Sequence, residues 1–261
     1  MERSDAIRPG GPSKERAASS LFGIPSGWLN PPVGDSARAA FVPLHYESNY
    51  AYPLIVWLHG PGDDERQLFE IMPLVSQRNY VAVAPRGLRI AGQQPGEEVW
   101  GWPQTSEHIS QAEQRIFDSI ETVCRKLHVA PARVFLAGSE AGGTMAFRAA
   151  MNYPARFAGV LSLGGPFPSG QTPLGQWTAA RSLAVFLAIG RDSLQYPPVR
   201  ACDDLRLFHA AGISVTLRQY PCGPLLSRQV LGDMDRWIME QIAASPNCVV
   251  RSGDRSACSP D

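Results

Sequence analysis

A five-residue segment near the middle of the chain places two side chains that can act as nucleophiles between small residues. The segment is Gly138-Ser139-Glu140-Ala141-Gly142. Glycine on both sides lets a strand turn sharply into a helix, and such a turn exposes the residue at its tip to a substrate. A serine at the tip attacks a carbonyl carbon when a histidine accepts its proton and a carboxylate orients that histidine. Ester hydrolysis is therefore the first chemistry to test against the rest of the sequence.

The residues around this turn predict the elements that hold it. The apolar run from Val134 to Ala137 has the length of a strand that is covered on both faces. After the turn, Met145, Ala146, Ala149 and Ala150 recur at helical spacing. A glycine-rich turn between strand and helix also binds phosphates, but the glutamate at the tip would repel them. We therefore expect no nucleotide or other cofactor here.

The segment also carries a family resemblance. Leu-Ala-Gly-Ser-Glu-Ala-Gly-Gly-Thr-Met-Ala, residues 136–146, resembles the phospholipase/carboxylesterase (dienelactone-hydrolase-like) family of α/β-hydrolases, which typically has Leu-Ala-Gly-Phe-Ser-Gln-Gly-Gly-x-Met-Ala. The resemblance covers about residues 35–243 and implies an α/β-hydrolase fold, with a mostly parallel twisted sheet and helices on both faces. Aligned without a gap, the catalytic serine of the family falls on Glu140, not on Ser139.

The resemblance extends to the loop that supplies part of the oxyanion hole. The apolar run from Pro53 ends in His59-Gly60, similar to the third strand of the family and its His-Gly loop. The next residue is Pro61, which has no N–H to donate to an oxyanion. We expect His59 to pack and to hold the loop by local hydrogen bonds. The positions implied for the oxyanion loop and pocket are His59, Gly60, Pro61, Gly62, Ala141, Trp100 and Trp102.

The acid and base positions of the implied triad are substituted as well. In the family the acid stands in a Gly-x-x-Asp-x-x-x-Pro pattern, which Gly190 and Pro197 match, and this places Ser193 at the acid. Asp192 is adjacent and would serve if the loop were shifted by one residue. The family's histidine, in Tyr-Pro-x-Gly-His, falls on Pro224. All five histidines, at positions 45, 59, 108, 128 and 209, precede the last expected strand.

Two functions follow from these substitutions. The first is a hydrolase-like protein without catalytic residues, a pseudoenzyme that binds an unknown small molecule or protein. The alternative is an active carboxylic-ester hydrolase with an atypical nucleophile, which is either Glu140 or, with Asp192 as the acid, Ser139. A serine without a neighbouring imidazole stays a weakly acidic alcohol, so the first function is preferred.

The remaining pattern alternates strands and helices, as a mostly parallel sheet with right-handed crossovers requires. Residues 88–106 contain three glycines and two prolines and predict a long loop over the mouth of the site, which could place Trp100 and Trp102 in a pocket. The expected strands are 37–46, 53–60, 80–87, 134–137, 157–165, 183–190 and 214–220. The expected helices are 67–77, 109–127, 198–211 and the segment around 230–242, with one more after the turn at Glu140.

Three consecutive acidic residues, Asp63, Asp64 and Glu65, precede the first expected helix. Carboxylates in a row could ligate a metal, but acidic residues at a helix start favour capping and the helix dipole. We therefore expect capping and no metal site.

The charge balance, the apolar runs and the cysteine content of the chain argue against several classes of function. The chain of 261 residues has 24 Lys plus Arg and 24 Asp plus Glu, so no net field attracts nucleic acid or an anionic membrane. No run of eighteen apolar residues predicts a membrane span. Five cysteines without a C-x-x-C pair favour a reducing, cytoplasmic location. We expect a disordered arm at 1–20, one domain at 21–244 and a flexible tail at 245–261, while the oligomeric state stays open.

Overall fold

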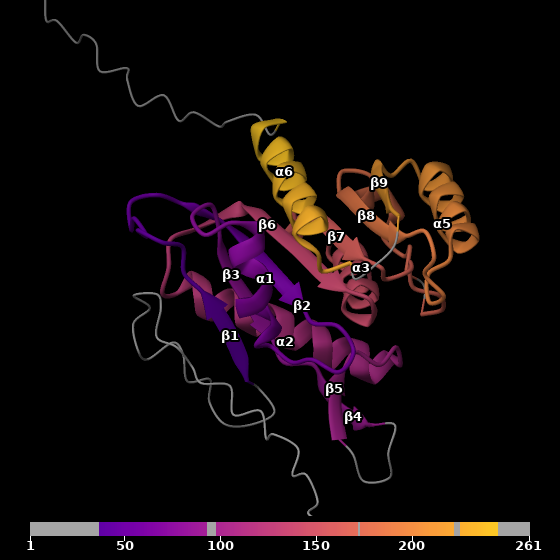
Figure 1. Cartoon of the computed structure of the whole chain (residues 1–261), viewed down its shortest axis with the longest axis horizontal. Coiled ribbons are helices and arrows are strands. Elements are labelled where there is room, and N and C mark those ends of the chain that lie inside the picture. Colours follow the sequence, from indigo (N-terminus) through magenta and orange to yellow (C-terminus); the bar gives the residue numbers. More distant parts are fainter. Residues whose placement is uncertain (1–36, 93–97, 172, 222–224, 245–261) are drawn as a thin grey trace, which may run out of the picture.

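The computed structural model describes residues 37–92, 98–171, 173–221 and 225–244. They form a seven-stranded sheet in the order β1-β3-β2-β6-β7-β8-β9 (Figure 1). The edge strand β1 pairs antiparallel with β3, and all other neighbours in the sheet are parallel. Its strands are β1 (Arg38–Phe41), β2 (Tyr52–Leu58), β3 (Val81–Pro85), β6 (Val129–Ser139), β7 (Gly159–Leu163), β8 (Ala184–Gly190) and β9 (Val215–Tyr220).

Helices cover both faces of this sheet (Figure 1). On one face lie α1 (Gln67–Val75) and α6 (Arg228–Ala244), whose buried residues share a core with Trp57. The buried residues of α2 (Ser106–Cys124), α3 (Ala141–Asn152) and α5 (Pro198–Ala211) belong to the core on the other face. Two short pieces, η1 (Pro154–Arg156) and α4 (Trp177–Ala180), complete the helices of the described residues. The mostly parallel fold predicted from the sequence is confirmed.

Strand β2 shows why an uninterrupted apolar run predicts a central strand of the sheet. Leu54 and Val56 point into the core under α2 and α3, whereas Ile55 and Trp57 point into the core under α1 and α6. Every residue of the strand is buried. A strand between two helical layers needs apolar side chains at each position, because neither of its faces meets water.

Residues 88–106 differ from the prediction. The sequence suggested one long loop, but β4 (Leu88–Ala91) and β5 (Glu98–Gly101) form an antiparallel hairpin, and α2 begins at Ser106. Cross-strand pairing places Arg89 opposite Trp100, and the Arg89 guanidinium contacts the Glu98 carboxylate at 2.8 Å. Each strand is only four residues long, so the glycines and prolines of this segment hid its pattern.

Some expectations concern residues that the structure does not describe. The arm predicted at 1–20 and the tail predicted at 245–261 lie outside the described residues, and the single domain at 21–244 remains a prediction. Among the helices that are described, none has the length and apolar character needed to cross a bilayer.

The turn between β6 and α3 is held against the end of β2 by direct backbone packing. A Cβ atom added at Gly142 would lie 2.2 Å from the Leu58 carbonyl oxygen and 2.5 Å from that of His59. A Cβ at Gly138 would lie 2.5 Å from the Gly142 carbonyl. Only glycine fits at these two positions, because neighbouring backbone atoms lie too close for a Cβ atom. This close packing holds the turn against the loop after β2.

We expect Gly142→Ala to destabilise the protein by about 3 kcal/mol, because the added methyl group overlaps two carbonyl oxygens that cannot rotate away. Gly232→Ala is the matched control, since a Cβ there meets no atom within 4 Å and α6 gains helix propensity. Urea unfolding measures both variants. A loss at Gly142 no larger than the change at Gly232 would refute the packing argument.

Candidate active site

The positions predicted for the site lie where strands of the parallel sheet end. His59 and Gly60 follow β2, Glu140 follows β6, and Ser193 follows β8. Strands β2, β6, β7 and β8 are parallel neighbours, so their carboxyl ends meet at one edge of the sheet. Open α/β sheets bind their ligands at this edge.

Glu140 occupies the tip of the turn. Its backbone has φ 49° and ψ −113°, a conformation that residues other than glycine rarely adopt. Its N–H donates to the Leu163 carbonyl at 2.8 Å, and its carbonyl accepts from the Thr144 N–H at 3.0 Å. Such strain costs on the order of 1–3 kcal/mol and persists only where the surroundings impose it. The turn thus has the geometry of a nucleophile elbow, with the half-buried Glu140 at its tip.

Ser139 lies one residue earlier and is buried. It is the last residue of β6 and pairs in register with Leu163 of β7. Its side chain is only 4% exposed, and its Oγ would lie 3.4 Å from a Cβ added at Gly60. The hydroxyl is therefore enclosed beneath the loop after β2, whereas a nucleophile must reach a substrate.

The loop after β2 is held by Gln67 of α1. The Gln67 side-chain oxygen accepts from the Trp57 indole at 2.8 Å and from the Gly60 N–H at 3.3 Å, while its amide donates to Asp63 at 2.6 Å. Pro61 has no N–H. No local sequence pattern indicates the role of Gln67, because its partner Trp57 lies in another element, strand β2.

On the other side of the elbow, Ala141 begins α3. The first N–H groups of a helix have no acceptor within the helix, so the Ala141 N–H is free of intrahelical bonding. Pro61, at the second donor position that the family resemblance implies for an oxyanion hole, has no N–H to donate.

His59 is fully buried, and both of its ring nitrogens are engaged by backbone groups. Nδ1 lies 2.9 Å from the Gly60 carbonyl, and Nε2 accepts from the Gly87 N–H at 3.0 Å. An acceptor at Nε2 places the proton on Nδ1, so the ring is neutral. Burial lowers the pKa of His59 below its usual value. The packing role predicted for His59 is confirmed by these contacts.

Trp102 contributes to the same cluster. Its indole donates to the His59 carbonyl at 2.9 Å, and the two rings lie 5.2 Å apart. The side chain is only 4% exposed, which places it beneath the surface. Trp100 is half-buried on β5, with the guanidinium groups of Arg86 and Arg89 at 4.8 and 5.4 Å from its ring.

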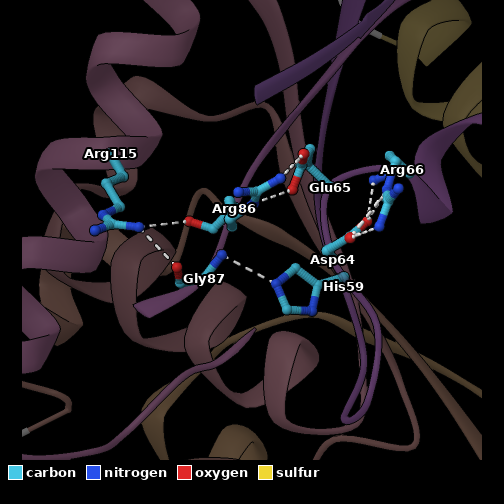
Figure 2. A network of polar contacts seen from close by, with 7 residues as sticks. All are labelled: His59, Asp64, Glu65, Arg66, Arg86, Gly87 and Arg115. Carbon is cyan, nitrogen blue, oxygen red and sulfur yellow. Dashed lines mark hydrogen bonds and ion pairs between the residues drawn. The ribbon is translucent and has the colours of Figure 1, made fainter. Parts of the chain in front are cut away.

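A buried ion pair joins the same loop to the end of β3. The Glu65 carboxylate has no exposed surface and receives two hydrogen bonds from Arg86, at 2.6 and 2.5 Å. Arg115 of α2 donates to the carbonyls of Arg86 and Gly87 at 3.1 and 2.7 Å (Figure 2). The hydrogen bonds that Arg86 donates to Glu65 raise the pKa of Arg86.

The capping role expected for the three acidic residues is therefore wrong for Glu65. Asp64 does accept the Arg66 N–H at 2.9 Å, but the residue that precedes α1 has no side-chain cap. Glu65 instead turns inward to Arg86, which is 21 residues away in the sequence. A partner at that separation leaves no local pattern, so the sequence could not reveal it. Asp63 accepts from Gln67.

The predicted acid position carries a hydroxyl that is already bonded. The Ser193 Oγ accepts the Tyr196 N–H at 3.1 Å within its own loop. Asp192 is largely exposed, and its carboxylate lies 3.5 Å from the Arg191 guanidinium. Pro224, at the predicted base position, lies outside the described residues.

The other histidines take up different places. His108 lies 2.7 Å from the Thr105 hydroxyl in the first turn of α2, and His128 lies 2.9 Å from the Ser48 carbonyl. His209 is exposed in the last turn of α5, and His45 is exposed beyond β1.

Comparison with known proteins assigns the family. The model of the Phospholipase/Carboxylesterase family matches residues 45–242. The chain belongs to the phospholipase/carboxylesterase family. This confirms the resemblance found in the elbow segment and in the His59-Gly60 loop.

Solved structures agree with this family in fold. Arabidopsis thaliana SOBER1 is 20% identical with a TM-score of 0.61, over 74% of this chain and 100% of that one. The Bacillus cereus carboxylesterase is 14% identical with a TM-score of 0.62, over 79% of this chain and 94% of its own. A ferulic acid esterase is 16% identical with a TM-score of 0.62, covering 78% and 92%.

We expect Glu65→Gln to destabilise this phospholipase/carboxylesterase-family chain by about 3 kcal/mol, because it leaves the Arg86 charge poorly solvated and unpaired. The control is Asp203→Asn, which breaks an ion pair of 2.7 Å whose side chains are 79% and 62% exposed. Such exposed pairs contribute roughly 0.5 kcal/mol or less. Equal losses in the two variants on urea unfolding would contradict the role given to the buried pair.

His59 predicts a pH dependence of stability. Its folded pKa is lowered, so as pH falls below about 6.5 the unfolded chain binds a proton that the folded chain does not. Stability should therefore fall with pH, by at most about 1.4 kcal/mol per unit from this group. His59→Gln should be less stable overall but show a shallower slope between pH 7.5 and 5.5.

Unfolding free energies of wild type and His59→Gln at the two pH values test this. An unchanged slope in His59→Gln would show that the ring does not resist protonation.

Proposed function

We propose that the chain binds a small molecule or a protein at its elbow and does not hydrolyse carboxylic esters through a serine nucleophile. The observation that carries this proposal is the residue at the tip of the turn. Glu140 has the strained backbone of an elbow nucleophile but carries a carboxylate in place of a hydroxyl.

The absence of an available base supports the same conclusion. The triad mechanism needs an imidazole that can accept the nucleophile's proton. His59 is the histidine beside the elbow, and both of its nitrogens are bonded to backbone groups. In the sequence, residues 222–224 are Cys-Gly-Pro, so the loop after the last strand offers no imidazole there.

The acid and the oxyanion hole add two further deficits. Ser193 carries no charge to orient a histidine, and Pro61 cannot donate to an oxyanion. Loss of one triad member alone lowers the rate on the order of ten thousand-fold or more. Substitutions at all three triad positions leave little basis for acyl transfer.

An active hydrolase with an atypical nucleophile is the competing function. Its better candidate is Glu140, since Ser139 is enclosed beneath Gly60. Attack by the Glu140 carboxylate on the carbonyl carbon of an ester would break the acyl C–O bond, release the alcohol and produce a mixed anhydride. A water molecule would then have to be activated to hydrolyse this anhydride. The Asp192 carboxylate, near the predicted acid position, is ion-paired with Arg191 and largely exposed.

The setting we propose for this binding function is the cytoplasm, on the basis of five cysteines without a C-x-x-C pair. The balanced charge supports a small molecule or protein as the partner, in preference to nucleic acid or an anionic membrane.

Hydrolysis of p-nitrophenyl butyrate by the purified protein tests the proposal. Wild type should show no turnover above the uncatalysed rate, because no group at the elbow is an activated hydroxyl. The variant Glu140→Ser, Ser193→Asp, Pro224→His should gain measurable turnover, because it restores the three groups to a scaffold that has the elbow geometry. Glu140→Ser alone is the matched control and should stay inactive.

Wild-type turnover that disappears in Glu140→Ala would overturn the proposal and identify the carboxylate as the nucleophile. Turnover that disappears only in Ser139→Ala would identify the buried serine.

A further inference from the structure

The Glu140 carboxylate has no protein partner within the described part of the chain. It forms no hydrogen bond and no ion pair there, in contrast to Glu65, Asp64 and Asp204. The side chain is half-buried at the tip of the elbow. A carboxylate in this position is partly removed from water, so that a positively charged partner would stabilise it.

The cations of the neighbouring loops are already engaged. Arg86 is bound in two hydrogen bonds to Glu65, and Arg66 is bound to Asp64. Arg191, beside the predicted acid position, contacts Asp192. The ring of His59 is neutral and bonded on both sides. The charge of Glu140 is therefore not balanced by the basic side chains of the loops around it.

Apolar surface adjoins this carboxylate. A Cβ added at Gly164 would lie 2.6 Å from the Cδ1 of Leu225 and 3.8 Å from the Cγ of Glu140. Leu225 is half-buried and packs against the core under α6. The Glu140 side chain and the Leu225 methyl groups thus meet the same small residue, and a ligand at the carboxylate would contact aliphatic carbon beside it.

We propose that the elbow binds a primary amine in its ammonium form, attached to a short aliphatic body. The ammonium group donates to the Glu140 carboxylate, and the aliphatic part covers Leu225. A charge-assisted hydrogen bond of this kind is about twice as strong as a neutral one. Carboxylic acids and other anions are rejected by the fixed charge of Glu140. This inference names the ligand class for the site proposed above, and it rests on that proposed binding function.

Calorimetric titration with three six-carbon probes tests the ligand class. The probes are n-hexylammonium, 1-hexanol and hexanoate, which share an alkyl chain and differ in head-group charge. Wild type should bind hexylammonium at least about ten-fold more tightly than hexanol, and hexanoate should show no measurable binding. Glu140→Gln should lose this preference for the amine.

Glu121→Gln is the matched control, because it removes the same charge from a 73% exposed side chain at the far end of α2. It should leave hexylammonium binding unchanged and thereby exclude an effect of net charge. Raising the salt concentration should weaken the amine and leave hexanol unaffected.

The inference is overturned if Glu140→Gln binds hexylammonium as tightly as wild type, if hexanol matches the amine in wild type, or if none of the probes binds. If hexanol binds as tightly as the amine, the proposed binding function would still be supported, and only the proposed ligand class would be wrong. Because no probe is an ester, failure of the proposed function would appear separately, as turnover of p-nitrophenyl butyrate.

Discussion

Close packing of backbone around the buried His59 ring is the constraint on which the candidate site depends. The imidazole joins the loop after β2 to the loop after β3, and the carbonyls of Leu58 and His59 leave room only for glycine at Gly142. The elbow is therefore positioned by contacts between main-chain atoms and one neutral ring. None of these contacts uses the side chain at the tip. A glutamate can replace a serine there without loss of the strained turn, and this separates the geometry of the elbow from its chemistry.

The ion pair between Glu65 and Arg86 connects the loop after β2 to the end of β3 and, through Arg86, to the β4–β5 hairpin. Arg115 fixes the carbonyls of Arg86 and Gly87 from α2, while Arg86 itself lies over Trp100 of β5. Three segments that are distant in the sequence thus meet around one buried carboxylate. Glu65 and Arg86 are joined by hydrogen bonds as well as by charge, so their contact specifies where the loop after β2 lies. Removing one partner of such a desolvated pair would leave the other charge unpaired, which is strongly destabilising.

Sequence reasoning succeeded where a signal is local. The apolar run of β2 reflects burial of the strand on both faces. The small residues around Glu140 reflect the close approach of backbone atoms at the turn. It failed for β4 and β5, because two four-residue strands carry too few positions to show alternation. It also failed for Glu65, because a carboxylate before a helix usually caps it and the partner Arg86 lies in another element. The roles of Glu140, Ser193 and Pro224 stay predictions, since they depend on chemistry that the fold alone does not determine.

A glutamate at the elbow does more than remove a hydroxyl. In an esterase, the start of the helix after the elbow faces an oxygen that becomes negative in the transition state, and the backbone N–H groups stabilise that charge. In the binding function proposed for this chain, the charge of Glu140 stands at the start of that helix, beside the Ala141 N–H. A second negative charge about 4 Å away would cost about 4 kcal/mol at an effective dielectric constant of about 20, close to a thousand-fold in rate. On this proposal a glutamate at the elbow reverses the electrostatic preference of the site, from a developing anion to a positively charged ligand.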